Sequence, residues 1–255
     1  MTLPPTTTTL APRPWRARFA ALHPNAYLGA HGLVGVVACI VMLWAFSFIA
    51  DEMTEQSLLV RVDHLIVGWL QAHGTESGET FFNFVSWVGS QVMTTIVVVG
   101  VIWLTLRRDW FRAIALTLAV MGGTALNDLL KALFHRGRPE AATEFIKYES
   151  WSFPSGHSMN SLIGFGFVAY LFLERTTDRR ARIAIIVATV ILVGLVGFSR
   201  LYLGVHYLSD VIAGFLAGAV WLLVCIAALQ FAERQRASRA PKVGPDGEAW
   251  SGAVR

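Results

Sequence analysis

The sequence has little charge and almost no cysteine. Of its 255 residues, only 15% are charged and 55% are hydrophobic, and the mean hydropathy is +0.53. Soluble domains carry roughly 25% charged residues, so the composition excludes an ordinary water-soluble globule and a disordered chain. The two cysteines, Cys39 and Cys225, lie in long apolar runs. This placement excludes a disulfide scaffold and favours a role as small apolar packing groups.

Long apolar runs are what the chain has instead. A transmembrane helix needs about 20 mostly apolar residues, and six stretches meet this description: 28–50, 81–106, 110–134, 158–173, 183–198 and 207–231. The fourth and fifth are short, and we expect them to extend into flanking residues. The first is longer than a signal-peptide core and lacks a small-residue cleavage site, so we interpret it as a retained span.

These runs predict an all-α, polytopic membrane protein built as a bundle of six transmembrane helices. Residues 28–231 are expected to form one membrane domain. The Thr- and Pro-rich segment 1–27 and the polar segment 232–255 are expected to be tails on the cytoplasmic side, without a fixed fold at 1–27 and 235–255.

The charges divide unequally between the two sides of this predicted topology. The side that carries both termini has 15 basic and 6 acidic residues, a balance of +9, whereas the opposite side has 6 basic and 11 acidic residues, a balance of −5. Positive residues gather on the cytoplasmic side of membrane proteins, so both termini are expected in the cytoplasm. The formal net charge of +4 is therefore interpreted as a topology signal and not as a sign of nucleic-acid binding. The bias and the small size favour a bacterial inner membrane.

Two further patterns concern helix packing. Leu58, Val62, Leu65 and Trp69 recur at helical spacing, which predicts an amphipathic segment within 51–80 that lies in the membrane interface as a connector, with a substrate lid as the alternative. The Gly-x-x-x-Gly pattern in 207–231 predicts a close helix contact inside the protein, with dimerisation as the alternative.

Polar residues collect at predicted helix ends. The third span ends near a lysine and an Arg-Pro pair, Pro-Ser-Gly-His precedes the fourth, Ser-Arg closes the fifth, and a histidine and an aspartate open the sixth. With the termini inside, all these ends lie at the outer membrane face, although the residues are spread over about 80 positions of sequence. Ionisable groups near lipid are costly and tend to be functional, so we expect one site here.

The basic and small residues of this set suit an anion. Lys131, Arg138 and Arg200 are cations that can hold phosphate oxygens. Ser155 supplies a hydroxyl donor, and Gly156 lets backbone N–H groups at a helix start approach an anion closely. The set predicts a phosphate-binding site, although Pro-Ser-Gly before a helix can also be only a turn and a cap.

The remaining residues suit phosphoryl transfer. His206 and Asp210 are four residues apart and so share a helix face, where the carboxylate can fix one ring nitrogen and leave the other to attack phosphorus. His157, from another helix, can protonate the departing oxygen. Together these groups predict transfer through a covalent phosphohistidine.

Neighbouring residues have simpler interpretations. Lys131 can pair with Asp128 or extend to the membrane interface. The histidines outside the motifs are expected to be surface or packing residues: His23, His31, His64, His73 and His135. Because His135 and Arg136 adjoin the site, substrate contact is the alternative for these two residues.

Three motifs are present without departure: Lys-x6-Arg-Pro at 131–139, Pro-Ser-Gly-His at 154–157 and Ser-Arg-x5-His-x3-Asp at 199–210. Over about 81–231 the chain resembles the type 2 phosphatidic acid phosphatases, which are integral membrane lipid phosphatases. The resemblance implies a six-helix core and no metal or other cofactor. It assigns His206 as nucleophile, Asp210 as its partner and His157 as general acid, with the phosphate held by Lys131, Arg138, Ser155, Gly156 and Arg200.

The resemblance leaves the substrate open. A phosphorylated lipid of the outer leaflet fits a site at headgroup depth, and we favour undecaprenyl pyrophosphate or a broad range of lipid phosphates. Phosphatidylglycerophosphate, phosphatidic acid and lipid A phosphates are alternatives, as is phosphotransfer to an acceptor other than water. An anion or lipid transporter is a distant alternative, because neither midplane charges nor an inverted repeat is visible. The loop 135–153, with Phe145, Tyr148 and Trp151, is expected to shape the choice.

Overall fold

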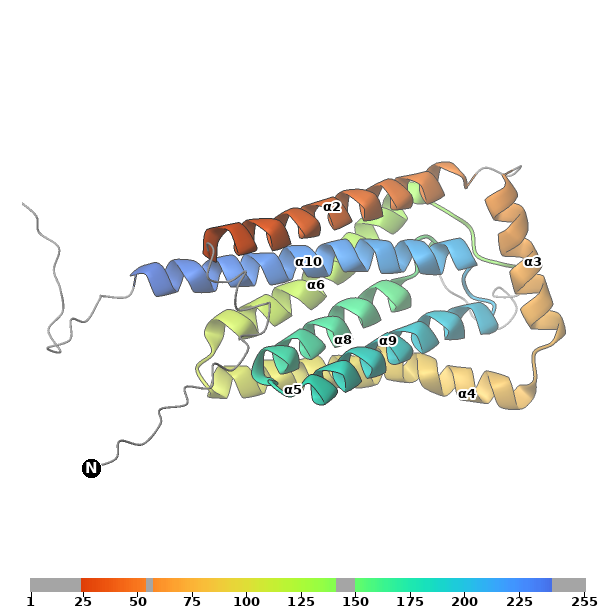
Figure 1. The fold of residues 1–255 in the computed structure, drawn as a ribbon. Coiled ribbons are helices and arrows are strands. Elements are labelled where there is room, and N and C mark those ends of the chain that lie inside the picture. Colours follow the sequence, from red (N-terminus) through yellow and green to blue (C-terminus); the bar gives the residue numbers. More distant parts are fainter. Residues whose placement is uncertain (1–23, 54–56, 141–149, 240–255) are drawn as a thin grey trace, which may run out of the picture. The chain divides into compact units, whose positions relative to one another are not determined.

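A computed structural model of the protein describes residues 24–53, 57–140 and 150–239 (Figure 1). The described residues are helical and contain no strand, which confirms the all-α class. The elements are α2 Pro24–Asp51, α3 Leu58–Ala72, α4 Glu76–Trp87, the π-helix η1 Val88–Val92, α5 Met93–Leu106, α6 Trp110–Phe134, α8 Gly156–Arg175, α9 Arg179–Tyr202 and α10 Leu208–Arg239.

The chain divides into two compact units, Met1–Val41 and Met42–Arg255. The first unit contains the beginning of α2. The second contains the end of α2 and every other helix, and it carries all the packing and the site described below.

Within the described part of the chain, five helical segments are long and apolar enough to cross a membrane: Gly32–Asp51, Glu76–Leu106, Trp110–Phe134, Arg179–Tyr202 and Leu208–Ser238. The predicted fourth span, α8, is the sixth long helix, and it is less apolar for a structural reason. It packs against α6, α9 and α10 and buries nine residues, so small and polar side chains such as Ser158 and Ser161 face neighbouring helices and not lipid. The protein is therefore an integral membrane protein with a six-helix pattern in which α8 is an inner helix.

The helix ends differ from the predicted ones in several places. Helices α8 and α9 extend beyond 158–173 and 183–198 at both ends, as expected. Helix α4 begins five residues before the predicted span, because the Thr75 side chain caps it by accepting a hydrogen bond from the Gly78 N–H at 3.1 Å. The predictions of tails were wrong at their inner edges, since α2 begins at Pro24 and α10 continues to Arg239; the rest of both segments lies outside the described residues.

Helix α3 has two different faces. The predicted apolar stripe is exposed, with relative exposures of 74%, 71% and 62% for Leu58, Leu65 and Trp69, and such a face suits the membrane interface. The opposite face buries Asp63 and Leu70 against the start of α10 and the end of α9. The interpretation of this segment as a connector that only lies on the membrane was therefore incomplete.

Two glycines bring α10 directly against α8. A Cβ atom at Gly214 would lie 2.6 Å from the Ser155 carbonyl oxygen, and one at Gly218 would lie 3.0 Å from the Met159 carbonyl oxygen. No side chain larger than hydrogen fits at either position without displacing the α8 backbone. The predicted close contact within the protein is confirmed, and it places the start of α8 beside the start of α10.

Candidate active site

The predicted site residues lie at one end of the second unit, where α6 and α9 end and where α8 and α10 begin (Figure 1). Direct contacts join the groups. The Ser155 N–H donates to the Asp210 carbonyl oxygen at 3.0 Å, and an Arg138 Nη atom lies 3.4 Å from His206 Nε2. The charges of Arg138, Asp210 and Arg200 all act on the Lys131 ammonium group. The structure thus brings together residues from all three motifs.

His206 lies in the connection between α9 and α10 and is only 2% exposed. The prediction that it shares a helix face with Asp210 was therefore wrong, because α10 begins two residues after His206. Its Nδ1 atom faces the Ser152 hydroxyl oxygen at 3.2 Å and Asp210 Oδ2 at 3.4 Å, while Nε2 faces the Arg138 guanidinium. When Nδ1 carries the ring proton, the Nε2 lone pair points toward the place where Arg138 can hold an anion. This orientation suits a nucleophile.

The protonation state of His206 also suits that role. Burial lowers the pKa of His206 from 6.5 to about 4, against the opposing effect of the hydrogen bond and charge of Asp210; Arg138 and Arg200 lower it further. The ring is therefore neutral at neutral pH, and only the neutral ring has a lone pair for attack.

The Asp210 carboxylate is fully buried and has hydrogen-bond donors on both oxygens. Oδ2 accepts from the Tyr207 N–H at 3.0 Å and from the Ser152 hydroxyl, and Oδ1 accepts from Arg136 at 2.6 Å. Ser152 can accept from His206 Nδ1 while it donates to Asp210, so the serine bridges the two residues.

Arg136 joins this group to α3. Its guanidinium donates to Asp210 and, at 2.8 Å, to Asp63 Oδ2, and it also donates to the Ser209 hydroxyl at 2.6 Å. Burial acts to lower the pKa of Arg136, but the carboxylates of Asp210 and Asp63 outweigh this effect and raise it above its ordinary value. Arg136 was a candidate for substrate contact; in the structure its guanidinium is bound to these two carboxylates instead.

The other guanidinium groups of the site are also held by the protein. Arg138 donates to the Val205 carbonyl oxygen at 3.0 Å, to the Ser150 carbonyl oxygen at 3.0 Å and to the Ser150 hydroxyl at 3.0 Å. Arg200 is 3% exposed and donates to the Ser86 hydroxyl on α4. Fixed cations of this kind can bind phosphate with little loss of side-chain freedom.

The segment before α8 is both a cap and a possible anion cradle. The Ser155 hydroxyl oxygen caps α8 by accepting from the Ser158 N–H at 3.4 Å, so the simple capping interpretation holds. A Cβ at Gly156 would lie 2.8 Å from the amide oxygen of Asn127, so a larger residue there would have to displace the Asn127 side chain of α6. His157 follows in the first turn of α8, where the helix dipole favours negative charge.

Comparison with known proteins finds a family match over the helices that carry the site. A sequence model described as the PAP2 superfamily matches residues 112–234, which include all three motifs. Nearly half of the chain, from residue 112 to residue 234, is therefore similar to the PAP2 superfamily.

Similar proteins include phosphatidylglycerophosphatase B of Bacillus subtilis (strain 168), which is 37% identical over 133 residues covering 51% of this chain and 63% of that protein. Lipid A 1-phosphatase of Rhizobium etli is 31% identical over 181 residues, covering 68% of this chain and 60% of that protein. The chain thus spans less than two thirds of the length of these curated relatives.

Two crystal structures have a similar fold. One is described as the first transmembrane PAP2 type phosphatidylglycerolphosphate phosphatase from Bacillus subtilis; it matches with a TM-score of 0.69 at 23% identity, covering 77% of this chain and 96% of that one. The other, LpxE of Aquifex aeolicus, matches with a TM-score of 0.52 at 23% identity, covering 69% of this chain and 98% of that one.

Several residues around the site were not predicted from the sequence: Asp63, Ser86, Ser150, Ser152 and Ser209. They lie outside the motifs or at motif positions that can vary, and only the nearness of Ser209 to Asp210 gave a signal. Among the described residues, no group of three or more His, Cys, Asp or Glu side chains could hold a metal ion.

Three other predictions concern aromatic rings near the site. The His64 ring packs on Tyr207, with 5.1 Å between ring centroids, and the His135 ring packs edge-on to Trp151 at 4.8 Å, which confirms a packing role for these two histidines. Phe145 and Tyr148, predicted to shape substrate choice, lie outside the described residues.

Proposed function

We propose that this protein is a member of the PAP2 superfamily and a phosphatase that removes phosphate from membrane lipids through a phosphohistidine at His206. One observation carries the proposal: Asp210 and Ser152 hold one ring nitrogen of His206, and the other ring nitrogen faces the guanidinium of Arg138. This arrangement combines an oriented, neutral nucleophile with a fixed cation that can hold its target.

In the first step, Lys131, Arg138, Arg200, the Ser155 hydroxyl and the backbone N–H of Gly156 bind the phosphate. His206 Nε2 then attacks phosphorus, the bond from phosphorus to the lipid oxygen breaks, and His157 gives its proton to that oxygen. The positive charge that develops on the His206 ring is stabilised by Asp210.

In the second step, water attacks the phosphohistidine. His157 takes a proton from this water, the phosphorus–nitrogen bond breaks, and inorganic phosphate leaves with His206 neutral again. The cycle needs no oxidant or reductant. An alcohol in place of water would make the same enzyme a phosphotransferase, so the products distinguish the two activities.

The substrate proposal is a phosphate monoester or diphosphate on a membrane lipid. The sequence favours undecaprenyl pyrophosphate or a broad range of lipid phosphates, whereas the names of the relatives favour phosphatidylglycerophosphate and lipid A 1-phosphate. These lipids share a phosphate at the headgroup depth of the bilayer, where helix ends carry the proposed site.

We also propose residues 28–231 as the catalytic membrane domain, in a bacterial inner membrane with both termini in the cytoplasm. The support is the charge balance of +9 on the side of the termini and −5 on the side of the site. The site then faces the periplasm.

The test is phosphate release by purified protein in detergent, with a chelator present, from undecaprenyl pyrophosphate, phosphatidylglycerophosphate, lipid A 1-phosphate and phosphatidic acid. We expect at least one lipid to be hydrolysed, His206→Ala to abolish the activity, and His73→Ala to retain it, because His73 lies at the end of α3 against Trp69. Absence of hydrolysis of every lipid, or full activity of His206→Ala, would contradict the proposal. Analysis of the products with an added alcohol would reveal phosphotransfer.

A further inference from the structure

Helix α3 belongs to none of the three motifs, yet it places a buried carboxylate beside the proposed site. Asp63 is 1% exposed. Its Oδ1 accepts from the Ser209 N–H at 3.0 Å, and its Oδ2 accepts from the Ser209 hydroxyl and from Arg136 at 2.8 Å. A buried carboxylate is costly unless it is paired and hydrogen-bonded, and Asp63 satisfies both conditions.

Arg136 lies between two carboxylates. One Nη atom is 2.6 Å from Asp210 Oδ1, and the other is 2.8 Å from Asp63 Oδ2. Its guanidinium also lies over the Tyr207 ring, 4.4 Å from the ring centroid, so its position is fixed on a third side. One guanidinium between two carboxylates leaves one net negative charge in the group.

The charge count matters for His206. A pair of Arg136 and Asp210 alone would be neutral, and its field at the His206 ring would be weak. With Asp63 sharing Arg136, Asp210 keeps an effective negative charge toward the ring as the phosphorus–nitrogen bond forms.

We propose that Asp63, acting through Arg136, is a positioning residue that keeps the charge and orientation of Asp210 directed at His206. Helix α3 is then part of the active site as well as a helix with an apolar outer face. The expected effect of Asp63 on kcat rests on the proposed function, whereas the ion pair between Asp63 and Arg136 does not.

The first test is Asp63→Asn, which keeps the shape of the side chain and removes its charge. We expect kcat to fall roughly 10- to 100-fold, the range typical of outer residues that orient a reacting group, with KM nearly unchanged because Asp63 holds no phosphate. Leu70→Ala is the matched control on the same buried face of α3, where Leu70 packs with Leu201 and Val211. It should lower the melting temperature and leave kcat unchanged.

The second test is the combination with Arg136→Gln. The single variant Arg136→Gln leaves two buried carboxylates, Asp63 and Asp210, without the cation between them. In the double variant Asp63→Asn/Arg136→Gln, only Asp210 is charged. We therefore expect the double variant to be more active than Arg136→Gln alone. Wild-type kcat in Asp63→Asn, or a double variant less active than Arg136→Gln, would overturn the proposal.

Melting temperatures of the same variants separate this inference from the proposed function. If the wild type hydrolyses none of the lipid phosphates, the function fails while the pairing can still be measured. The destabilisation of the double variant should then be smaller than the sum of the two single ones, and an additive result would overturn the pairing.

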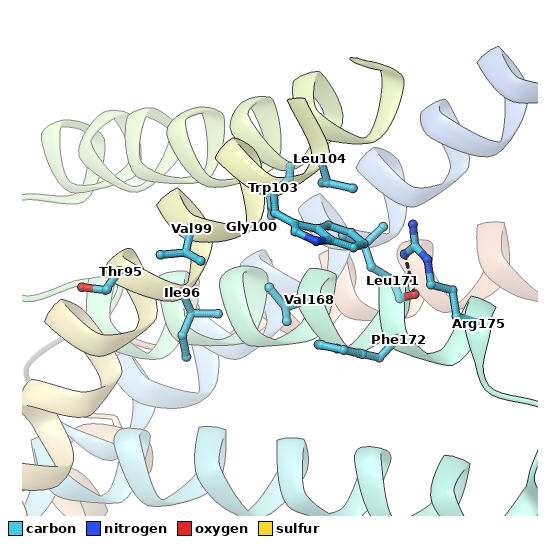
Figure 2. A pocket seen from close by; sticks show the side chains of 11 residues that line it. Thr95, Ile96, Val99, Gly100, Trp103, Leu104, Val168, Leu171, Phe172 and Arg175 are labelled. Atoms are coloured by element: carbon cyan, nitrogen blue, oxygen red, sulfur yellow. Dashed lines mark hydrogen bonds between the residues drawn. The ribbon is translucent and has the colours of Figure 1, made fainter. Parts of the chain in front are cut away.

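A different observation supports a second inference, at the opposite end of α8. A groove of about 450 Å³ lies between α5, α6 and α8. Its lining side chains are mainly apolar and include Ile96, Val99, Trp103, Val168 and Phe172 (Figure 2). Phe172 and Val99 are each 59% exposed. Because these helices cross the membrane, the groove opens toward lipid.

Cations lie at one end of this groove. The guanidinium groups of Arg107 and Arg175 each lie 5.5 Å from the centroid of the Trp103 ring. Arg175 donates to the Leu171 carbonyl oxygen at 3.2 Å, lies 3.6 Å from the carboxylate of Asp109 and is 43% exposed. An apolar groove that ends at two guanidinium groups has the shape and charge of an anionic phospholipid.

We infer that the groove binds one acyl chain of an anionic phospholipid whose phosphate pairs with Arg107 and Arg175. The probe is phosphatidylglycerol, with phosphatidylcholine as the uncharged comparison, added to protein in detergent and detected by native mass spectrometry. We expect several-fold greater retention of phosphatidylglycerol by the wild type.

The variants locate the site. Val168→Trp fills the groove and Arg107→Gln/Arg175→Gln removes the charge, so both should lose the preference. Ile186→Trp, at an exposed position on α9, should keep it. Equal retention of the two lipids by the wild type, or an unchanged preference in Val168→Trp, would overturn the inference.

Discussion

The two ends of helix α8 differ in the burial and polarity of their side chains. At its start, Ser155, Ser158 and Ser161 are fully buried, and α10 lies against the backbone through Gly214. At its end, Phe172 is 59% exposed and Arg175 is 43% exposed, beside an apolar groove.

The difference shows how one helix serves two purposes in a membrane. Polar groups are buried where hydrogen-bond partners surround them, as around Ser155 and Asp210, because an unpaired polar group costs most where water is absent. The opposite end needs only apolar surface and a charged rim, which tolerate substitution. Changes at the start of α8 should therefore reduce activity far more than changes at its end.

The largest expected effect is that of Asp210→Asn at the polar end. The amide cannot stabilise the positive charge on His206 and can hold the wrong ring tautomer, so kcat should fall by about 10³- to 10⁴-fold, as for the equivalent change in a Ser-His-Asp triad. Steady-state kinetics on the best lipid phosphate measure this. Glu174→Gln, at the apolar end, should stay within about twofold of wild type, and a loss below tenfold in Asp210→Asn would argue against its role.

The next effect comes from filling the contact between α8 and α10. Gly214→Val would force its Cβ to within 2.6 Å of the Ser155 carbonyl oxygen, so we expect a lower melting temperature, a destabilisation of about 1–3 kcal/mol and reduced activity. Gly194→Ala is the matched control, since a Cβ there meets no atom within 4 Å, and it should be neutral or slightly stabilising. An unchanged melting temperature in Gly214→Val would contradict the close packing.

A smaller effect is expected from Ser152→Ala. This change removes the hydroxyl between His206 Nδ1 and Asp210 while the carboxylate keeps its bonds to Tyr207 and Arg136. We expect kcat to fall roughly tenfold, the loss of one charge-assisted hydrogen bond. Ser238→Ala, near the far end of α10, serves as control, and equal activities of the two variants would show that the serine does not bridge the pair.

The smallest effect concerns pH. His206 attacks when neutral, and its pKa is lowered to about 4, so its neutral fraction barely changes between pH 8 and pH 5 and halves near pH 4. The acidic limb of kcat/KM that belongs to His206 should therefore lie near pH 4. A different result would contradict this prediction: kcat/KM of the wild type falls by half near pH 6.5, and the same fall remains when any other histidine is replaced. His206 would then have the pKa of an ordinary histidine.

Much of this architecture could be predicted from the sequence because hydropathy and motif spacing are local signals. Six apolar runs indicated the helices. The motif residues lay at the ends of predicted spans, and these ends meet at one membrane face because successive spans cross the membrane in opposite directions. The spacing of Gly214 and Gly218 likewise indicated a close helix contact.

The positioning groups could not be predicted, because tertiary packing decides them. Asp63 stands among apolar residues of an amphipathic helix, where a carboxylate normally marks the solvent face, and its partner Arg136 is 73 residues away. Ser152 is an ordinary loop serine until the loop meets α10. The start of α4 and the π-helix within the second apolar run also depend on contacts that composition does not record.

The phosphohistidine at His206 is tested most directly by trapping the covalent intermediate. Wild-type protein would be mixed rapidly with a lipid carrying labelled phosphate, quenched in alkali, which preserves phosphohistidine, and digested for peptide mapping. We expect label on the peptide that contains His206 and none in His206→Ala. Label on another peptide, or hydrolysis at the wild-type rate by His206→Ala, would contradict this expectation.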